Sequence, residues 1–275
     1  MATVATNGVN LFYQRTGKGE PLILVHGSWA DHTTWDRVVP ELSQYFEVIS
    51  YDRRGHSRSS APAGQGRIAE DVADLAALVK ALNVAPVHVA GNSLGGSITL
   101  RLAASEPDLV RSISAHEPPL LGLLGADPNS AQALLGVQQR IGAVLEVLRE
   151  GEDARAAKLF VETVALGPGM WDQLPEATRQ VMTTNAQTFL DEAGDPEGLV
   201  MDLGALCRYA KPAQLSTGDQ SPPLFPAVLD LVAAVLPHAE RLTYRGSGHL
   251  PQETDPQGYV RGLSGFLRGV AATPA

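Results

Sequence analysis

The stretch "APVHVAGNSLGGSITLRLAAS" (residues 85–105) decides the fold, because a strand passes directly into a helix within it. At the junction stands Gly91-Asn92-Ser93-Leu94-Gly95, a G-x-S-x-G sequence. Glycines on both sides let neighbouring backbone pass close to a turn so tight that the serine is strained above the sheet edge. This context predicts that Ser93 is a nucleophile. It also predicts that the N–H of Leu94, the first helical residue, points toward the serine.

The segments on either side repeat the alternation of strand and helix. Continuous apolar runs at 21–27 and 46–52 are typical of strands buried on both faces. Asn7-Gly8 predicts a hairpin, and residues 68–82 carry apolar side chains at helical spacing. The pattern predicts an α/β fold with a doubly wound, mostly parallel sheet covered by helices on both faces. The further elements that we expect are strands at 109–117, 212–219 and 239–246, and helices at 225–236 and 256–271.

The pattern changes between residues 120 and 210, where strand signals give way to helical ones. We therefore expect a core formed by residues 1–119 and 211–275, with residues 120–210 inserted as a helical cap. The helices expected in the cap lie at about 129–150, 152–166, 175–191 and 196–209.

Composition restricts the classes of partner. The 275 residues are 44% apolar and 19% charged, and 21 basic against 30 acidic residues leave a net charge of −9. This acidity argues against nucleic acid or an anionic membrane as a partner, since both need a basic face. One cysteine, Cys207, excludes an internal disulfide, and we expect its thiol to be buried. The sequence predicts no signal peptide and no spanning helix, and therefore a cytoplasmic protein.

No stretch of the sequence predicts a bound metal or cofactor. Histidines and carboxylates show no metal-ligand spacing. The glycines of "GKGEPL" (17–22) and "GQGR" (64–67) are not followed by the strand-to-helix phosphate loop that a nucleotide site requires. We expect neither a metal site nor a cofactor, and the oligomeric state cannot be inferred from the sequence.

Three further motifs carry a resemblance to a known family. They are "LVHGSW" (24–29), "YDRRGHSRSS" (51–60) and "GSGHLPQETDP" (246–256). With the turn around Ser93 and the helical insertion, they resemble the α/β-hydrolase fold superfamily over almost the whole chain. The resemblance implies a serine hydrolase. It also implies that the turn Asp52-Arg53-Arg54-Gly55, like His26 and His56, is structural.

The resemblance also supplies the partners of the nucleophile. The histidine of the last motif, His249, corresponds to the general base, and His116 is its main rival among the other histidines. The residue after the His-Gly pair lends a backbone N–H to the oxyanion hole in such enzymes, which implies Ser28. Its counterpart is the Leu94 N–H, and the chemistry agrees, because a tetrahedral oxyanion needs two preorganised donors.

The carboxylate that should support His249 has two candidates. Most of the superfamily places it three residues after a glycine at the end of the strand 212–218, but that position is Ser221, and Asp219 comes two residues too early. Glu117 ends the strand that follows the nucleophile's helix, and neighbouring parallel strands end at the same edge. The "HEPP" stretch is similar to the zearalenone-type lactonases, which use a Ser-His-Glu set. Glu117 is our first candidate and Asp219 the alternative, while a solvated Glu117 stays possible.

These residues predict a hydrolase that cleaves a carboxylic ester or lactone of an apolar small molecule through an acyl-enzyme. Two alternatives stay open: carbon–carbon bond hydrolysis by the same residues, and a small-molecule receptor with weak turnover. The cap faces the nucleophile, so some of its apolar side chains should line the substrate pocket. The side chains that we expect there are Trp29, Leu121, Trp171 and Met182.

Overall fold

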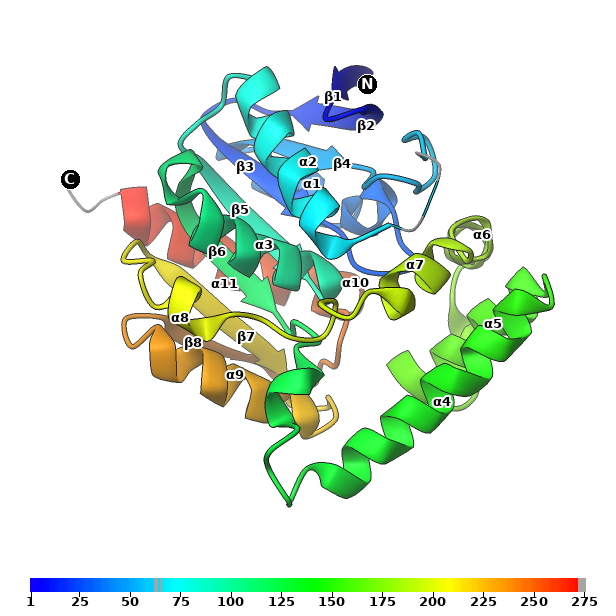
Figure 1. Cartoon of the computed structure of the whole chain (residues 1–275). Helices are drawn as coiled ribbons and strands as arrows, with labels where there is room; N and C mark the ends of the chain where they lie inside the picture. Colours follow the sequence, from blue (N-terminus) through cyan, green and yellow to red (C-terminus); the bar gives the residue numbers. More distant parts are fainter. Residues whose placement is uncertain (62–63, 65, 272–275) are drawn as a thin grey trace.

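One mixed sheet organises the molecule (Figure 1). The computed structural model describes residues 1–61, 64 and 66–271. Within these residues, eight strands form a sheet in the order β1-β2-β4-β3-β5-β6-β7-β8. The strands from β4 to β8 are parallel, while β2 is antiparallel to both β1 and β4. The strands are β1 Ala2–Thr6, β2 Val9–Thr16, β3 Glu20–Val25, β4 Phe46–Tyr51, β5 Val87–Asn92, β6 Val110–His116, β7 Ala213–Gly218 and β8 Glu240–Tyr244.

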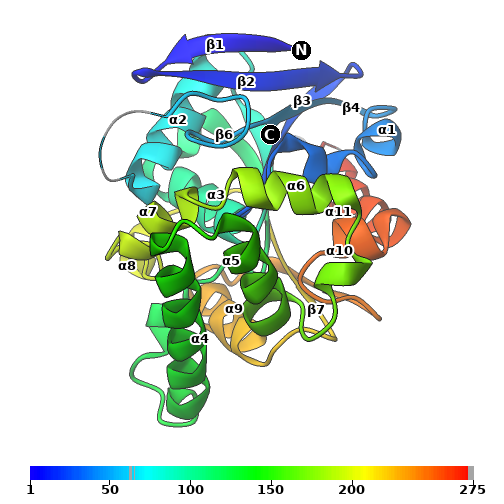
Figure 2. The ribbon, with the colours of Figure 1, turned by 90° about the vertical axis from the view of Figure 1, so that its right-hand side faces the viewer.

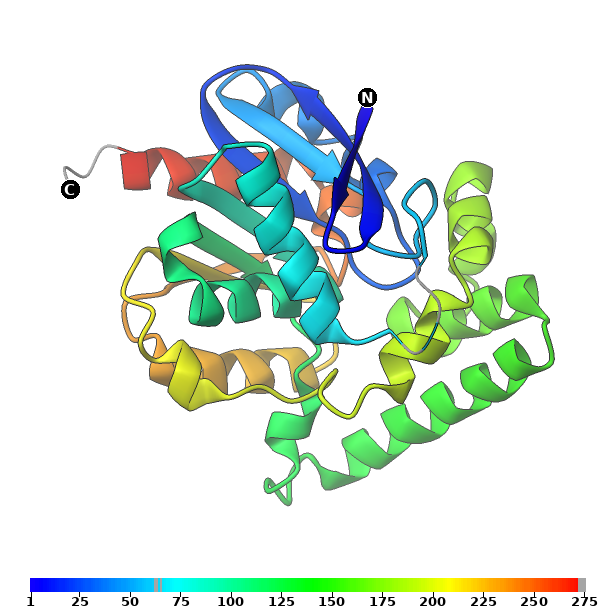
Figure 3. The same cartoon turned by 45° about the horizontal axis from the view of Figure 1, so that its top comes forward.

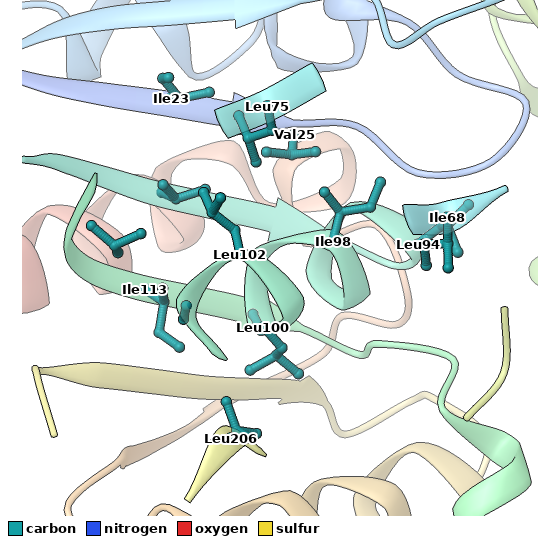
Figure 4. Packing of buried hydrophobic residues seen from close by; sticks show 14 of the residues in the cluster. Ile23, Val25, Ile68, Leu75, Leu94, Ile98, Leu100, Leu102, Ile113 and Leu206 are labelled. Carbon is teal, nitrogen blue, oxygen red and sulfur yellow. The ribbon is translucent and has the colours of Figure 1, made fainter. Parts of the chain in front are cut away.

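Helices cover both faces of the sheet, as the sequence predicts. Alternate residues of a strand point to opposite faces, so Ile23 and Val25 of β3 pack with α2, α3 and α9. Leu22 and Leu24 pack with α1 and α11 on the other face. Figure 4 shows the first of these clusters, in which Ile98 and Leu102 of α3 face the sheet. The helices are α1 Val39–Leu42, α2 Ile68–Ala81, α3 Leu94–Ser105, α9 Leu224–Val235, α10 Pro251–Thr254 and α11 Pro256–Ala271.

The segment between β6 and β7 forms helices α4 to α7 beyond the carboxyl ends of the parallel strands, whereas its last helix, α8, packs beside α3 (Figures 1 and 2). Figure 3 shows α4 to α6 standing to one side of the sheet. Leu121 and Leu206, near the two ends of the segment, pack into the main core. The boundaries 120 and 210 stay a prediction. The helices are α4 Ala131–Arg149, α5 Asp153–Phe160, α6 Glu176–Thr184, α7 Thr188–Gly194 and α8 Leu203–Leu206.

Short turns of helix connect these elements. One turn, η4 (Val161–Ala165), is π-helical and continues α5. The others are 3₁₀ turns: η1 His32–Trp35, η2 Pro107–Leu109, η3 Leu121–Leu124 and η5 Trp171–Gln173.

Three local expectations are wrong in this part of the chain. The helix expected at 175–191 is divided by a turn into α6 and α7. The helix expected at 196–209 is reduced to Leu203–Leu206, because tertiary contacts take the carbonyls ahead of it. The Leu199 carbonyl accepts from the Gly122 N–H at 2.9 Å, and Arg101 donates to the Val200 carbonyl. Cys207, expected to be buried, is an exposed free thiol. Among the described residues, no helix combines the length and apolar character that crossing a bilayer requires.

Candidate active site

Ser93 occupies a strained turn between β5 and α3. Its backbone has φ 56° and ψ −126°, a conformation that costs a non-glycine residue about 1–3 kcal/mol. The turn closes only because its flanking residues lack side chains: a Cβ on Gly95 would lie 2.1 Å from the Val25 carbonyl oxygen. The Ser93 N–H donates to the His116 carbonyl at 2.9 Å, which ties the turn to the end of β6. The sequence therefore lifts Ser93 above the sheet edge, as its motif predicts.

The turn that follows β3 lies directly against this serine. A Cβ on Gly27 would lie 2.9 Å from the Ser93 Cβ and 3.5 Å from its Oγ. Ser28 is the next residue and is partly exposed. Leu94 is the first residue of α3, so its N–H has no acceptor within the helix. The two expected N–H donors thus stand on the two segments that meet at Ser93.

His249 lies on the loop between β8 and α10, next to the nucleophile turn. The Asn92 side-chain amide donates to the His249 carbonyl at 2.8 Å, which joins this loop to the residue before Ser93. The imidazole stacks on the Phe225 ring, with centroids 4.7 Å apart and planes inclined by 21°. These contacts fix both the loop and the plane of the ring.

Glu117 supports the imidazole directly. The His249 Nδ1 lies 2.7 Å from Glu117 Oε2, and the other carboxylate oxygen accepts from the Thr217 hydroxyl at 2.7 Å and the Gly218 N–H at 2.8 Å. The side chain is fully buried, and its backbone φ is 45°. Burial by itself would raise the pKa of Glu117, but the hydrogen bond from His249 and the charges of His249 and His116 outweigh it and lower this pKa to about 2. The carboxylate is therefore ionised at neutral pH.

This pairing sets the chemistry of His249. A carboxylate at Nδ1 holds the proton on that nitrogen, which leaves Nε2 as the free base. The arrangement can therefore accept a proton at Nε2 and stabilise the resulting imidazolium.

Asp219 and Ser221 follow the end of β7. The exposed Asp219 carboxylate accepts from the Gly246 N–H at 2.8 Å and from Gln220 at 3.0 Å, so it joins the turn after β7 to the loop after β8. Ser221 lies near the His249 loop, where its Oγ would be 3.8 Å from a Cβ on Gly248. Of the two candidate acids, the fold brings Glu117 and not Asp219 to His249.

His116, the rival histidine, is buried beside Glu117. Its Nδ1 lies 3.0 Å from the Ser216 hydroxyl, and its Nε2 lies 3.8 Å from Glu117 Oε2. Burial lowers the pKa of His116 to about 4, so the ring is neutral at pH 7. His116 is the last residue of β6 and approaches the Glu117 carboxylate from within the sheet, whereas His249 approaches it from the loop after β8.

Comparison with known proteins identifies the family. Residues 20–256 match the family described as alpha/beta hydrolase fold. The chain belongs to the alpha/beta hydrolase family. The expected fold is thereby confirmed, together with the resemblance that the motifs around Ser93 and His249 carry.

Two curated proteins are similar to this chain over part of its length. The uncharacterized hydrolase YraK of Bacillus subtilis (strain 168) is 37% identical over 124 residues, which cover 44% of this chain and 46% of YraK. The (E)-2-((N-methylformamido)methylene)succinate hydrolase of Acinetobacter baylyi is 30% identical over 159 residues, or 58% of this chain and 54% of that enzyme. The matches thus span about half the length of these relatives.

Solved structures share the whole fold. An alpha/beta hydrolase from Sphaerobacter thermophilus superposes with a TM-score of 0.78 at 24% identity, covering 97% of this chain and 100% of the other. A thermophilic esterase from Thermogutta terrifontis gives 0.77 at 24% identity, over 98% and 97%. The enol-lactonase of Burkholderia xenovorans gives 0.67 at 20%, over 97% and 100%. At these identities the likeness shows the fold alone.

An aromatic cluster joins the cap to the turn beside Ser93. The Trp29 ring is fully buried and stacks on Phe160, with centroids 4.9 Å apart, while Phe189 lies 5.1 Å from both rings. Trp171 and Met182 pack on the edge of this cluster. The fold therefore brings together three of the four side chains expected in the pocket. Leu121, the fourth, belongs to the main core instead.

One group of possible metal ligands was not foreseen from the sequence. Donor atoms of Asp31, His32 and Asp52, all buried, lie within 4.8 Å of one another. Each carboxylate already accepts several hydrogen bonds: Asp52 from the His32 N–H and ring, and Asp31 from Thr33 and Ser57. These bonds shape the loop after β3, so the group serves the fold as a hydrogen-bond network.

Sequence reasoning missed three contributors to the site: Asn92, Thr217 and Phe225. Asn92 lies inside the G-x-S-x-G motif, but the motif leaves that position open. Thr217 precedes the glycine at the end of β7, and only the pairing of β7 with β6 shows that it reaches Glu117. Phe225 is the second residue of α9, far from any motif, and nothing in the sequence places it against His249.

Proposed function

We propose that this hydrolase cleaves a carboxylic ester or lactone of an apolar small molecule through an acyl-enzyme on Ser93. The observation that carries the proposal is the 2.7 Å hydrogen bond between His249 Nδ1 and the buried Glu117 carboxylate. The loop that carries His249 is itself hydrogen-bonded to Asn92, next to Ser93. A histidine oriented in this way is the base that a serine nucleophile needs.

The acylation step uses the three side chains in order. Ser93 Oγ bonds to the substrate carbonyl carbon while its proton moves to His249 Nε2, and the carbonyl π electrons move to the oxygen. The N–H groups of Ser28 and Leu94 stabilise this oxyanion. When the oxyanion collapses, the carbon–oxygen bond of the ester breaks, and the leaving alkoxide takes the proton from His249.

Deacylation repeats the sequence with water as the nucleophile. His249 Nε2 removes a proton from water, and the resulting hydroxide bonds to the acyl carbon. Collapse of the second tetrahedral species breaks the bond to Ser93 Oγ, which recovers the proton. Glu117 stays ionised throughout and stabilises the imidazolium of each step.

The cap supports an apolar substrate. Trp29 lies one residue beyond the proposed oxyanion donor and packs with cap aromatics, while Trp171 and Met182 are partly exposed beside it. Pockets for small molecules are lined mainly by such side chains. The fold is shared with an esterase and an enol-lactonase, which agrees with this class of reaction.

The test is Ser93→Ala assayed with p-nitrophenyl butyrate and with an aliphatic lactone. We expect kcat to fall at least about 10³-fold, because the nucleophile of the unit is lost. Ser105→Ala is the matched control: Ser105 ends the same helix and bonds only to carbonyls of that helix. The proposal is wrong if Ser93→Ala hydrolyses both substrates as the control does.

A further inference from the structure

Arg53 is a buried cation between the core and the cap. It follows β4 in the turn that the sequence marked as structural, and it is 1% exposed. Its Nη1 lies 3.2 Å from Asp71 Oδ2 of α2, and its Nη2 lies 2.5 Å from Glu192 Oε1 of α7. Burial opposes the charge, but these two carboxylates outweigh it and raise the pKa of Arg53. The guanidinium is therefore always charged.

The same guanidinium reaches the turn beside Ser93. Arg53 Nη2 donates to the Gly27 carbonyl at 3.2 Å, and His26 Nδ1 lies 2.8 Å from the same oxygen. His26 Nε2 accepts from the Arg53 backbone N–H at 2.9 Å, so its Nδ1 carries the proton and donates. Burial lowers the pKa of His26 well below its usual value, which keeps the ring neutral. Two donors thus hold one carbonyl oxygen.

That carbonyl belongs to the peptide unit whose N–H is Ser28. A trans peptide is planar, so its C=O and N–H point in opposite directions, and fixing one fixes the other. Gly27 has no side chain to hinder rotation of this unit. A flip would put a carbonyl oxygen where the oxyanion needs a donor, and the hydrogen bonds from Arg53 and His26 oppose that flip.

We propose that Arg53 is a positioning residue that holds the Gly27–Ser28 peptide with its N–H available to the oxyanion, and that Glu192 makes this orientation depend on the seating of the cap. The inference rests on the proposed function, because it takes the Ser28 N–H as an oxyanion donor. The positive charge beside the Gly27 oxygen also polarises the amide and strengthens its N–H as a donor.

The cap meets the core on both sides of Glu192. Asn185, before α7, donates to the Ala30 carbonyl at 3.0 Å and accepts from the Ser57 N–H at 2.7 Å. Asp195, after α7, accepts from the Ile68 N–H at 2.7 Å. Contacts with the core therefore flank α7 at both of its ends. Glu192 reaches Arg53 only when α7 is docked on the core.

The experiment removes Arg53 together with both of its carboxylate partners, in Arg53→Met/Asp71→Asn/Glu192→Met. Replacing all the charges of a buried ion-pair network by neutral side chains of similar size is often tolerated by the fold. The readouts are kcat and KM for p-nitrophenyl butyrate and the inhibition constants of an alkyl trifluoromethyl ketone and its methyl ketone analogue. Ser93 Oγ adds to the carbonyl carbon of the fluorinated ketone and forms an oxyanion, whereas the methyl ketone binds without this addition.

We expect kcat to fall about 10- to 100-fold, somewhat less than the about 10²- to 10³-fold that follows complete loss of an oxyanion donor. The inhibition constant of the trifluoromethyl ketone should rise by the same factor. KM and the affinity of the methyl ketone should stay within about threefold, because they report ground-state binding. Arg53→Lys, which keeps the charge but not the forked donor geometry, should restore part of kcat.

The matched control is Arg54→Met/Glu70→Met/Asp74→Asn. It removes the neighbouring arginine together with its two carboxylate partners on the same helix α2, and Arg54 has no hydrogen bond to the described 26–29 turn. We expect the midpoint of thermal unfolding to shift in both variants. The ratio of the two ketones' inhibition constants, called the ketone ratio, should change only in the Arg53 variant. The inference is overturned if the two variants show the same ketone ratio, or if both ketones weaken equally. If Ser93→Ala keeps its activity, the proposed function fails instead.

Discussion

The ends of β6 and β7 both carry an acid, and the two acids do opposite things. Glu117 at the end of β6 is fully buried, with one carboxylate oxygen on His249 and the other on Thr217 and Gly218. Asp219 at the end of β7 is exposed and joins the turn after β7 to the loop after β8 at Gly246. The strand that carries the exposed acid supplies the hydrogen bonds that hold the buried one.

The difference teaches that strand position and burial, more than residue type, decide which acid serves the histidine. A buried carboxylate must be fully hydrogen-bonded, and β7 provides those donors from its own end. Once they are directed at Glu117, the acid at 219 has no partner in the site and turns outward. The contrast between the two acids can be tested by two substitutions and by a change of pH.

Glu117→Gln should have the largest effect. The amide cannot stabilise the imidazolium and no longer fixes the proton on His249 Nδ1, so we expect kcat to fall about 10³- to 10⁴-fold with KM nearly unchanged. Steady-state kinetics with p-nitrophenyl butyrate measure this, with thermal unfolding followed in parallel. A loss below tenfold in folded protein would remove Glu117 from the mechanism.

The stability of the wild type at acidic pH should depend on the same carboxylate. Its folded-state pKa of about 2 lies below the usual 4.5, so ionised Glu117 stabilises the fold above pH 4.5, and this stabilisation is lost as the pH falls toward 2. The expected loss is about 3 kcal/mol of unfolding free energy. Urea unfolding from pH 6 to pH 2.5 should show a flatter dependence in Glu117→Gln than in the wild type. Parallel curves would contradict the assignment.

Asp219→Asn should have the smallest effect. Asparagine keeps an oxygen that accepts from the Gly246 N–H, so we expect kcat within about threefold of the wild type and a small change in stability. The same assay and unfolding series measure it. A loss of kcat as large as that of Glu117→Gln would reverse the comparison of the two strand ends.

Local patterns predicted the core closely. The helices over 94–105 and 256–271 have the expected bounds, and the strands before and after Ser93 lie within a few residues of their expected positions. Each of these elements buries a defined face, so the spacing of its apolar residues predicts its type and position. The prediction failed at 196–209, where hydrogen bonds from Arg101 and Gly122 to backbone carbonyls override helical propensity.

The site was predictable where a motif fixes the backbone. The turn around Ser93 and the His249 loop follow from glycine spacing, and Glu117 follows from the order of parallel strands. The partners of Arg53 do not. Gly27, Asp71 and Glu192 lie far apart in the sequence, and only the docking of α7 on the core brings them to one guanidinium. No local pattern contains that information.

The most direct test of the central claim is the proton NMR signal of His249 Nδ1–H. A short hydrogen bond to an ionised carboxylate moves this resonance far downfield of the other protons and slows its exchange. The account predicts that the signal is present in the wild type and in Asp219→Asn and absent from Glu117→Gln. A signal that survives in Glu117→Gln and disappears in Asp219→Asn would contradict it.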